Sequence, residues 1–266
     1  FTHTYSIVAR DEKTGEMAIG VQTHWFSVGT GVSWGEAGVG VIATQALVNK
    51  SLGPKGLALL KEGLDAKTTL DSLLAQDELR EARQLSILDA KGNVATYTGK
   101  NCVSFAGHIQ GKQYAVQSNM MIANDVNKKM SVAFESSEGK PLAERVILAL
   151  EAAQKTGGDI RGQQSAVLMV FKGKKGNEPW NEKLVDLRID DHQTPVKELR
   201  RLYTAHLIYQ HMNKAAGFYE KSDMSAAMKE YQEAIKMAPS NQEISFWMAV
   251  MLANDRQIKT ALPIFK

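Results

Sequence analysis

The sequence has 266 residues, 44% of them hydrophobic, and a formal net charge of +3. A chain of this length and apolar content can bury a sizeable core, most simply as one large domain and one small domain. The positive charge is weak and dispersed, which argues against nucleic-acid binding. No apolar run approaches the roughly 18 residues that a membrane span needs, and the single cysteine, Cys102, excludes an internal disulfide.

The first ten residues place hydroxyl side chains at a chain end and then continue as a predicted strand over residues 4–10. Thr4 heads this strand. A threonine at such a place can act as a nucleophile if its own free α-amine, which titrates near ~8, serves as the general base. This chemistry depends on removal of Phe1, Thr2 and His3, which precede Thr4. Because the first residue is not methionine, we expect the chain start to have been made by processing or by design.

Strand and helix signals then alternate up to about residue 190. Gly15 and Gly92 lie in connections between strand pairs, where a positive φ favours glycine. The segment 39–46 is apolar on nearly both faces, so it is expected to lie between layers. Hairpins followed by clustered helices indicate an α+β layered domain. The predicted strands cover 4–10, 17–22, 39–46, 84–88, 94–98, 113–117 and 165–171, and the predicted helices cover 54–62, 66–75, 125–135 and 141–155.

From about residue 194 the pattern changes to continuous helix, and an internal repeat is present. Small and large apolar residues recur with a period of 34, which is typical of tetratricopeptide repeats. An ordinary amphipathic helical hairpin shows part of this pattern, but the matched spacings favour a repeat. Residues 215–241 resemble one complete repeat and 244–266 most of a second, so the array is expected to be incomplete or to dock on something. The matched pairs are Ala227 with Ala261, Tyr231 with Phe265, and Phe218 with Leu252.

Polar and aromatic residues gather in three stretches at the ends of predicted strands, at 22–29, 44–49 and 117–121. The amides of Gln45 and Asn119 can stabilise an oxyanion, although loop-capping hydrogen bonds are the favoured interpretation of either one alone. His24 and His108 could each be a base or a metal ligand. Neither has a second histidine at a metal-ligand spacing, so no metal or cofactor is expected.

Seven sequence blocks then follow one another in the order found in one bacterial and archaeal family. The blocks are TYSIVARD at 4–11, VQTHWFSVG at 21–29, AGVGVIATQ at 37–45, LGPKGL at 52–57, QSNM at 117–120, GGDIRGQQSA at 157–166 and VDLRIDDH at 185–192. Over about residues 4–203 the chain therefore resembles the domain-of-unknown-function family ten-twenty-eight, placed in the N-terminal-nucleophile (Ntn) hydrolase superfamily. The resemblance implies a four-layer αββα sandwich over residues 1–203, and the 34-residue period predicts tetratricopeptide-like repeats over 204–266.

By superfamily membership the resemblance also implies hydrolysis of amide bonds. Many relatives begin with Met-Thr-aromatic-Ser, so loss of the methionine would expose the residue that corresponds to Thr4. In this interpretation Thr4 is the nucleophile, Asn119 or Gln45 binds the oxyanion, and Ser6 orients the amine or the substrate from the same side of the strand. His24 and Arg161 would line the substrate pocket, with Arg161 fixing a substrate carboxylate.

A second hypothesis is a non-catalytic binding protein, in which the sandwich is a scaffold and Thr4 merely begins a strand. The partners expected are a small amide or peptide substrate for the enzyme and a protein partner for the repeats. No nucleic acid or membrane span is expected, and a homodimer is the default assembly. The sequence leaves open whether the protein is exported or cytoplasmic.

Overall fold

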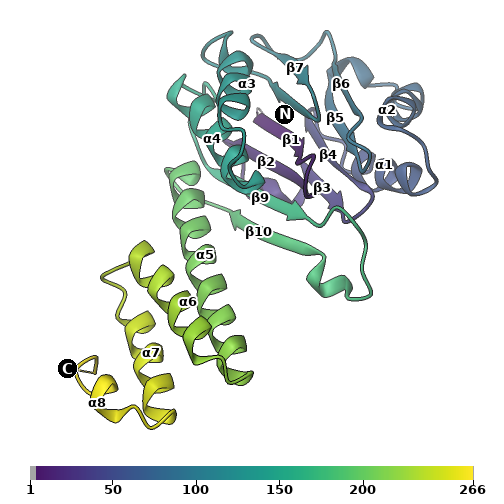
Figure 1. Cartoon of the computed structure of the whole chain (residues 1–266). Coiled ribbons are helices and arrows are strands. Elements are labelled where there is room, and N and C mark those ends of the chain that lie inside the picture. Colours follow the sequence, from purple (N-terminus) through teal and green to yellow (C-terminus); the bar gives the residue numbers. More distant parts are fainter. Residues whose placement is uncertain (1–3, 266) are drawn as a thin grey trace. The chain divides into compact units, whose positions relative to one another are not determined.

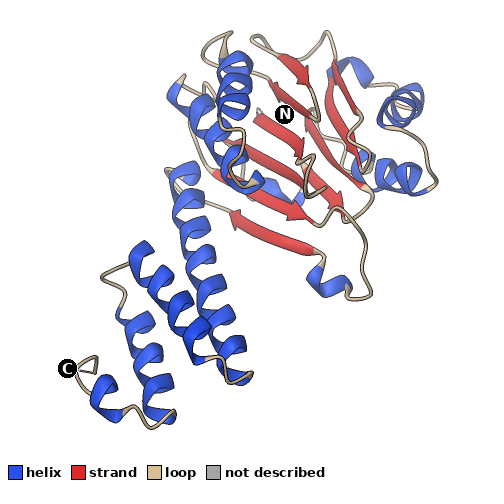
Figure 2. Cartoon of the chain, viewed as in Figure 1, coloured by secondary structure: helices blue, strands red, loops and turns tan. Residues whose placement is uncertain are grey.

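The computed structural model describes residues 4–265. The chain divides into two compact units, Phe1–Leu199 and Arg200–Lys266. The first unit holds the strands and the second is helical (Figure 2). No helix within residues 4–265 is long and apolar enough to cross a membrane.

The first unit contains two antiparallel sheets (Figure 1). The larger sheet has the strand order β10-β9-β2-β1-β8-β7, and the smaller has the order β3-β4-β5-β6. Strands of the two sheets contact each other face to face, with β1 against β4 and β5 against β8. The strands are β1 (Thr4–Arg10), β2 (Met17–Thr23), β3 (Ser33–Glu36), β4 (Gly40–Ala46), β5 (Arg83–Asp89), β6 (Val94–Thr98), β7 (Gly107–Gly111), β8 (Tyr114–Ser118), β9 (Ser165–Phe171) and β10 (Lys183–Ile189).

Helices cover the outer faces of both sheets. The helices α1 (Leu52–Lys61) and α2 (Ala66–Ala75) contact strands of the smaller sheet, whereas α3 (Val126–Ser136) and α4 (Leu142–Lys155) contact strands of the larger one. In Figure 1 the two pairs lie on opposite sides of the sheets. The α+β class expected from the sequence is confirmed, with the order helices, sheet, sheet, helices.

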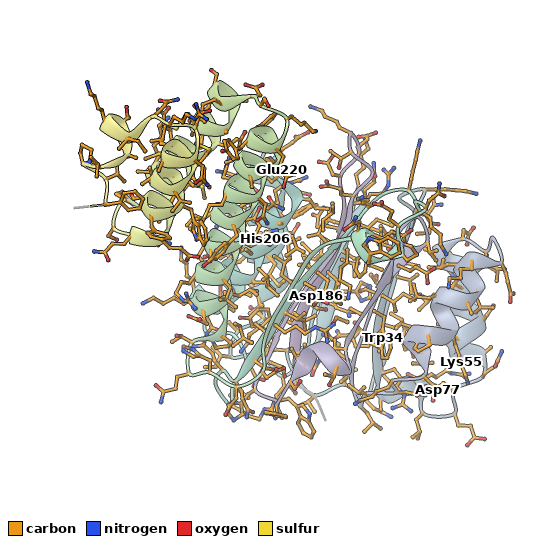
Figure 3. All side chains as sticks on the ribbon, turned by 90° about the horizontal axis from the view of Figure 1, so that it is seen from below. Trp34, Lys55, Asp77, Asp186, His206 and Glu220 are labelled. Atoms are coloured by element: carbon orange, nitrogen blue, oxygen red, sulfur yellow. The ribbon has the colours of Figure 1, made fainter. Side chains whose placement is uncertain are left out.

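Glycines let helices approach the sheets closely at two places. A Cβ added at Gly20 in β2 would lie 2.4 Å from Val146 Cγ1 of α4. A Cβ added at Gly53 in α1 would lie 2.2 Å from the ring of Trp34 in β3, a tryptophan that is labelled in Figure 3. Real Cβ atoms do not approach other atoms this closely, so both positions need glycine for helix–sheet packing.

Alternation along β1 explains how one strand serves two layers. The Tyr5 hydroxyl donates to Gln154 of α4 on the outer face, and the Ser6 hydroxyl donates to Gln45 of β4 on the inner face. Val8 follows Ser6 on the inner face and packs in an apolar cluster with Val41 of β4. The inner face of β1 therefore changes from polar to apolar within five residues.

Most predicted elements are present, and β1, β6, β9 and α2 have the predicted bounds. Three strands had no strong sequence signal: β3, β7 and β10. All three are edge strands of their sheets. β4, in contrast, is buried along its whole length, as predicted.

The second unit repeats its backbone conformation after 34 residues. The helices α5 (Pro195–Glu220), α6 (Met224–Met237), α7 (Gln242–Asn254) and α8 (Ile258–Ala261) are joined by short turns. Ser222 and Arg256 both adopt left-handed backbone, with φ of 62° and 64°. The matching turn bonds are Asp223 N–H to Phe218 O and Gln257 N–H to Leu252 O, each 2.9 Å.

Candidate functional site

Polar side chains occupy one end of the layer between the two sheets. The strand register arranges them in rows, and every member of these rows is buried. The rows run from the end where β1 begins toward the middle of the layer. The first row is Thr4, Thr23, Gln45 and Gln84; the second holds the polar Ser6, Gln117 and Ser86 together with Val21 and Ala43; the third is Val8, Ile19, Ala115, Val41 and Leu88.

Thr4 is held on both its side chain and its main chain. Its hydroxyl donates to Thr23 Oγ1 over 3.2 Å. Its carbonyl oxygen accepts from the main-chain N–H of Asn119 and from Gln45 Nε2, each at 3.1 Å. Thr4 is completely buried in this arrangement. A nucleophilic Thr4 with a free α-amine requires removal of Phe1, Thr2 and His3. These three residues lie outside the part of the chain that the structure describes.

Ser6 lies in the next row and is bonded to two amides. Its hydroxyl donates to Gln45 Oε1 over 2.7 Å and accepts from Gln117 Nε2 over 3.2 Å. Gln117 Nε2 also donates to the carbonyl of Ala43 in the facing sheet. Ser6 therefore fixes the orientation of Gln45, which in turn holds the carbonyl of Thr4.

Gln84, which the sequence analysis did not select, joins these residues. Its Oε1 accepts from Gln45 Nε2 at 2.7 Å and from Asn119 Nδ2 at 3.0 Å. Its Nε2 lies within 3.0 Å of Thr98 Oγ1 and the carbonyls of Gly107 and Ser118. We call the connected set the amide network; its members are Thr4, Ser6, Gln45, Gln84, Gln117 and Asn119.

The backbone is strained next to two of the amides. Ala46 follows Gln45 with φ of 70°, and Met120 follows Asn119 with φ of 54°. Non-glycine residues in this region cost about 1–3 kcal/mol each and gather at functional sites. The strain fixes the directions in which the chain leaves β4 and β8 beside the amide network.

Some acceptors of this end have no partner within residues 4–265. They include Gln117 Oε1, Asn119 Oδ1 and Ser86 Oγ, all of which are buried. A buried polar atom without a partner costs about 1–3 kcal/mol, so a protein selected for stability alone would not gather several of them. A bound ligand that carries donors could satisfy them.

His24 and Arg161 form a second cluster around Asp159, whose side chain is fully buried. Arg161 Nη2 lies 2.9 Å from Asp159 Oδ2, and the main-chain N–H of His24 donates to the same oxygen over 3.1 Å. Thr23, the partner of Thr4, directly precedes His24, so the two clusters meet where β2 ends. Of the predicted site residues, Thr4, Ser6, Gln45 and Asn119 thus belong to one cluster, and His24 and Arg161 to the other.

The amide network contains no ionisable side chain. Burial, reinforced by the Asp159 carboxylate, raises the pKa of the neighbouring Tyr5 well above its usual range, so Tyr5 remains neutral. The titratable group nearest to Gln84 along the hydrogen bonds is His108, whose Nδ1 lies 2.8 Å from Thr98 Oγ1. A nucleophile in the network would therefore need a base from outside these six side chains, and the α-amine of Thr4 could be that base.

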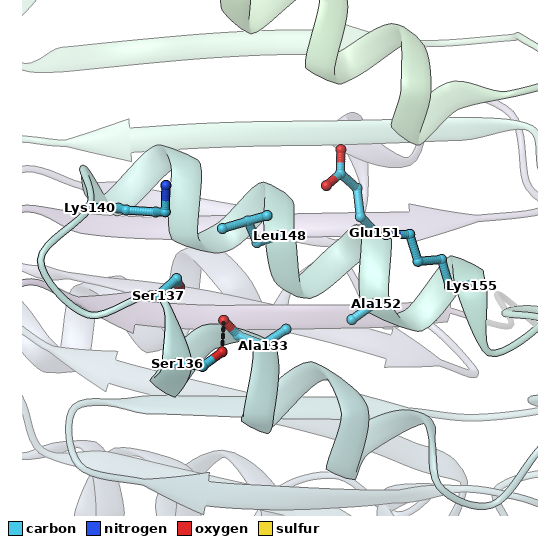
Figure 4. Close-up of a pocket in the computed structure, with 8 residues that line it drawn as sticks. All are labelled: Ala133, Ser136, Ser137, Lys140, Leu148, Glu151, Ala152 and Lys155. Atoms are coloured by element: carbon cyan, nitrogen blue, oxygen red, sulfur yellow. Dashed lines mark hydrogen bonds between the residues drawn. The ribbon is translucent and has the colours of Figure 1, made fainter.

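One surface hollow adjoins the amide network, and another lies away from it. One, of about 390 Å³, is lined by Phe105, His108, Asn127 and Lys128 among others, and it reaches the network through His108. The other, of about 270 Å³, lies between α3 and α4 on the outer helical layer, where Ser136 Oγ donates to the carbonyl of Ala133 (Figure 4). Residues 4–265 hold no group of three or more side chains able to bind a metal ion.

Comparisons with solved structures find several similar proteins. A crystal structure of a protein from Silicibacter pomeroyi, which carries the family model DUF1028, is similar to this chain with a TM-score of 0.68 and 29% sequence identity. The match covers 76% of this chain and 88% of that one. Anbu (ancestral beta-subunit) from Yersinia bercovieri gives a TM-score of 0.36 and 13% identity, covering 77% of this chain and 95% of that one. No protein with a curated description matches. The sequence of residues 4–199 matches the family of unknown function DUF1028, and the chain belongs to this family.

Proposed function

We propose that the first unit is an amide-bond hydrolase of the N-terminal-nucleophile type, with Thr4 as the nucleophile. The observation that carries the proposal is the position of Thr4 at the head of β1, where its hydroxyl and its carbonyl are both held by buried uncharged groups. The layered arrangement of helices and sheets, together with the resemblance to the Ntn superfamily, supports the same assignment. The fold alone does not carry it, because one fold serves many functions.

The chemistry uses groups of a Thr4 that has become the first residue. Thr4 Oγ1 attacks the amide carbonyl, and its proton passes to the Thr4 α-amine. The resulting oxyanion accepts hydrogen bonds from N–H groups of the site. The tetrahedral intermediate expels the amine, which takes the proton back from the Thr4 ammonium, and leaves an ester on Thr4. Water then hydrolyses this ester, releases the acid and regenerates the hydroxyl.

This mechanism requires that a substrate can reach Thr4. Thr4 is completely buried in the described structure, and an internal amide nitrogen cannot accept a proton as an amine does. Activity therefore requires a chain that begins at Thr4. His24 and Arg161, held by Asp159 at the end of β2, are proposed to line the entrance to the opened site.

The test compares the 266-residue chain with a chain that begins at Thr4. In the shortened form, Thr4→Ala removes the nucleophile, and Thr30→Ala, an exposed threonine on a short helix, is the matched control. The probe is an α′,β′-epoxyketone, which needs a hydroxyl and a free amine on one residue to form its ring adduct. We expect one adduct per chain in the shortened protein and in its Thr30→Ala variant.

Turnover of a panel of anilide and peptide amides is measured on the same proteins. Thr4→Ala is expected to lower kcat by about three orders of magnitude or more, as is typical when a covalent nucleophile is removed. Equal labelling and equal turnover of the shortened protein and its Thr4→Ala variant would contradict the mechanism and favour the non-catalytic scaffold.

A separate observation favours a binding role for the second unit. Phe246, Trp247 and Phe265 are each nearly half exposed, and their rings contact one another edge to face, with centroids 5.4 Å and 5.8 Å apart. We propose that these tetratricopeptide-like helices bind an apolar protein segment. Deleting residues 215–266 should leave turnover within severalfold, and complete loss with the first unit still folded would contradict the division of roles.

A further inference from the structure

The supply of N–H groups in the amide network is limited, because a side-chain amide has only two. Gln45 Nε2 has two acceptors, the carbonyl of Thr4 and Gln84 Oε1. Gln117 Nε2 also has two, Ser6 Oγ and the carbonyl of Ala43. Neither amide has an N–H left for a substrate unless it gives up a bond that holds the site together.

Asn119 differs from these two amides. Within residues 4–265 its Nδ2 has one acceptor, Gln84 Oε1, so its second N–H remains available. Its main-chain N–H donates to the Thr4 carbonyl over 3.1 Å, which anchors the residue directly beside Thr4. Asn119 is thus the amide of the network that combines a position next to Thr4 with an uncommitted donor.

Gln84 determines which way the Asn119 amide is turned. Gln84 Nε2 faces the main-chain carbonyls of Gly107 and Ser118, and a carbonyl can only accept. The reverse orientation would place Gln84 Oε1 against these two oxygens. Gln84 Oε1 must therefore face Asn119, and Asn119 must present its nitrogen to it. The polarity of the site is set by the backbone of β7 and β8 and is transmitted by Gln84.

We infer that Asn119 donates the hydrogen bond to the oxyanion, that Gln84 is the positioning residue that orients it, and that Gln45 only clamps the Thr4 carbonyl. This assignment rests on the proposed hydrolase function. It decides between the two amides that the sequence left as alternatives, and it adds a residue on the opposite sheet that touches no reacting atom. Gln84 acts through Asn119 and Gln45, both of which it bonds.

The first experiment measures the orientation without any activity. In the isotope-labelled full chain, scalar couplings across hydrogen bonds identify each donor and acceptor by NMR. We expect a coupling from Asn119 Nδ2 to the side-chain carbonyl carbon of Gln84, and couplings from Gln84 Nε2 to the carbonyl carbons of Gly107 and Ser118. A coupling in the opposite direction, from Gln84 Nε2 to the Asn119 side-chain carbonyl carbon, would overturn the inference.

The second experiment uses kinetics of the chain that begins at Thr4. Asn119→Ala should lower kcat by about 100- to 1,000-fold with KM within severalfold, as removal of an oxyanion donor does elsewhere. Gln84→Met should lower kcat about tenfold or more at every pH. The control Gln110→Met changes an exposed glutamine of β7 and should leave both constants unchanged. A normal kcat for Asn119→Ala, with a large loss in Gln45→Ala, would assign the donor to Gln45 instead.

Gln84→Glu separates positioning from simple packing. When protonated, the introduced carboxylic acid can donate to a main-chain carbonyl and still accept from Asn119, whereas its ionised form places a charge against those carbonyls. Relative to the unsubstituted protein at the same pH, the kcat of this variant should therefore be nearly normal at low pH and fall as pH rises, with no such slope in the relative kcat of Gln84→Met. Titration of the Thr4 amine affects all three proteins alike and cancels in this ratio. Parallel pH profiles of the two variants would overturn the positioning role. Absence of any Thr4-dependent turnover would remove the hydrolase and the oxyanion role together, while the NMR couplings would still decide the orientation of Gln84.

Discussion

The two ends of the layer between the sheets are built on different principles. At the end where β1 begins, Thr4 and Ser6 are surrounded by amides, and each amide atom needs a partner in a defined direction. Two residues further along the same face of β1, Val8 packs in an apolar cluster that includes Ile19 and Leu88. Apolar packing is non-directional and stabilises the fold in proportion to the area buried. The polar end contributes less stability and more positional order, which is the pattern expected where a protein gives up stability for function.

The largest effect on stability is expected at the apolar end. Leu88→Ala removes a fully buried side chain from the apolar cluster and should lower the free energy of unfolding by about 3 kcal/mol. Urea unfolding followed by circular dichroism measures the change. Leu79→Ala, which truncates an exposed leucine, is the control and should change the free energy by less than about 0.5 kcal/mol. A loss below about 1 kcal/mol in Leu88→Ala would mean that this end does not provide the stability.

A smaller effect is expected when a hydroxyl is added to the apolar end. Val8→Thr keeps the shape of the side chain but places a hydroxyl among apolar groups, which should cost about 2 kcal/mol. The measurement is again the free energy of unfolding. If the variant were as stable as the original chain, the layer would accept polar groups along its whole length, and the comparison of the two ends would fail.

Removing a hydroxyl from the polar end is the reciprocal change. Ser6→Ala leaves Gln45 Oε1 without its donor and should lower the free energy of unfolding by about 1 kcal/mol. If the first unit is a hydrolase, kcat of the chain that begins at Thr4 should fall as well, because Gln45 loses its orientation. Ser136→Ala, in the groove between α3 and α4, should change neither quantity. An increase in the free energy of unfolding without any change in kcat would show that Ser6 does not hold Gln45 in position.

The smallest effect concerns pH and His108. This residue is exposed overall, but desolvation of part of its ring lowers the pKa of the imidazole. A histidine whose pKa is lower in the folded state binds protons more readily when unfolded, so its contribution to stability is present above about pH 6.5 and declines as the pH falls. His108→Gln should therefore flatten the dependence of the unfolding free energy on pH between about 5 and 7.5. His192→Gln, at an exposed position, is the control, and an equal flattening there would contradict the assignment.

The sequence predicted the interior of the fold better than its edges. β4 and β9 are buried along their whole lengths; β9 is apolar from Ala166 to Phe171 and β4 from Val41 to Ala43, which is a strong strand signal. β7 begins and ends with glycine, and alternate residues along it are exposed; β10 carries charged residues at Lys183, Asp186 and Arg188. An edge strand needs less apolar surface because only one neighbour pairs with it, so its composition is close to that of a loop. The division of the chain after residue 203 stays a prediction, beside compact units that divide after residue 199.

The sequence indicated the candidate-site residues that lie at the ends of strands or near the head of β1, but it did not indicate Gln84. Gln45 and Asn119 lie where strands end, and they bond the same residue. That residue, Gln84, lies near the start of β5, directly after Arg83, and looks like an ordinary boundary residue. The signal that was available is its register: Gln84 and Ser86 alternate on β5 as Thr4 and Ser6 do on β1. Recognising the match requires knowing that the two strands face each other, which only the tertiary structure provides.

The turns at Ser222 and Arg256 have a consequence for how this family member could change its length. Both turns use the same left-handed residue conformation and the same closing hydrogen bond, 34 residues apart. Inserting a single residue into a helix rotates everything beyond it by about 100° and turns buried side chains such as Ala227 toward solvent. A tandem duplication of the whole 34-residue unit preserves the phase of every helix. Length variation among descendants of this chain should therefore come in whole repeats, and a one-residue insertion in α6 or α7 should be selected against.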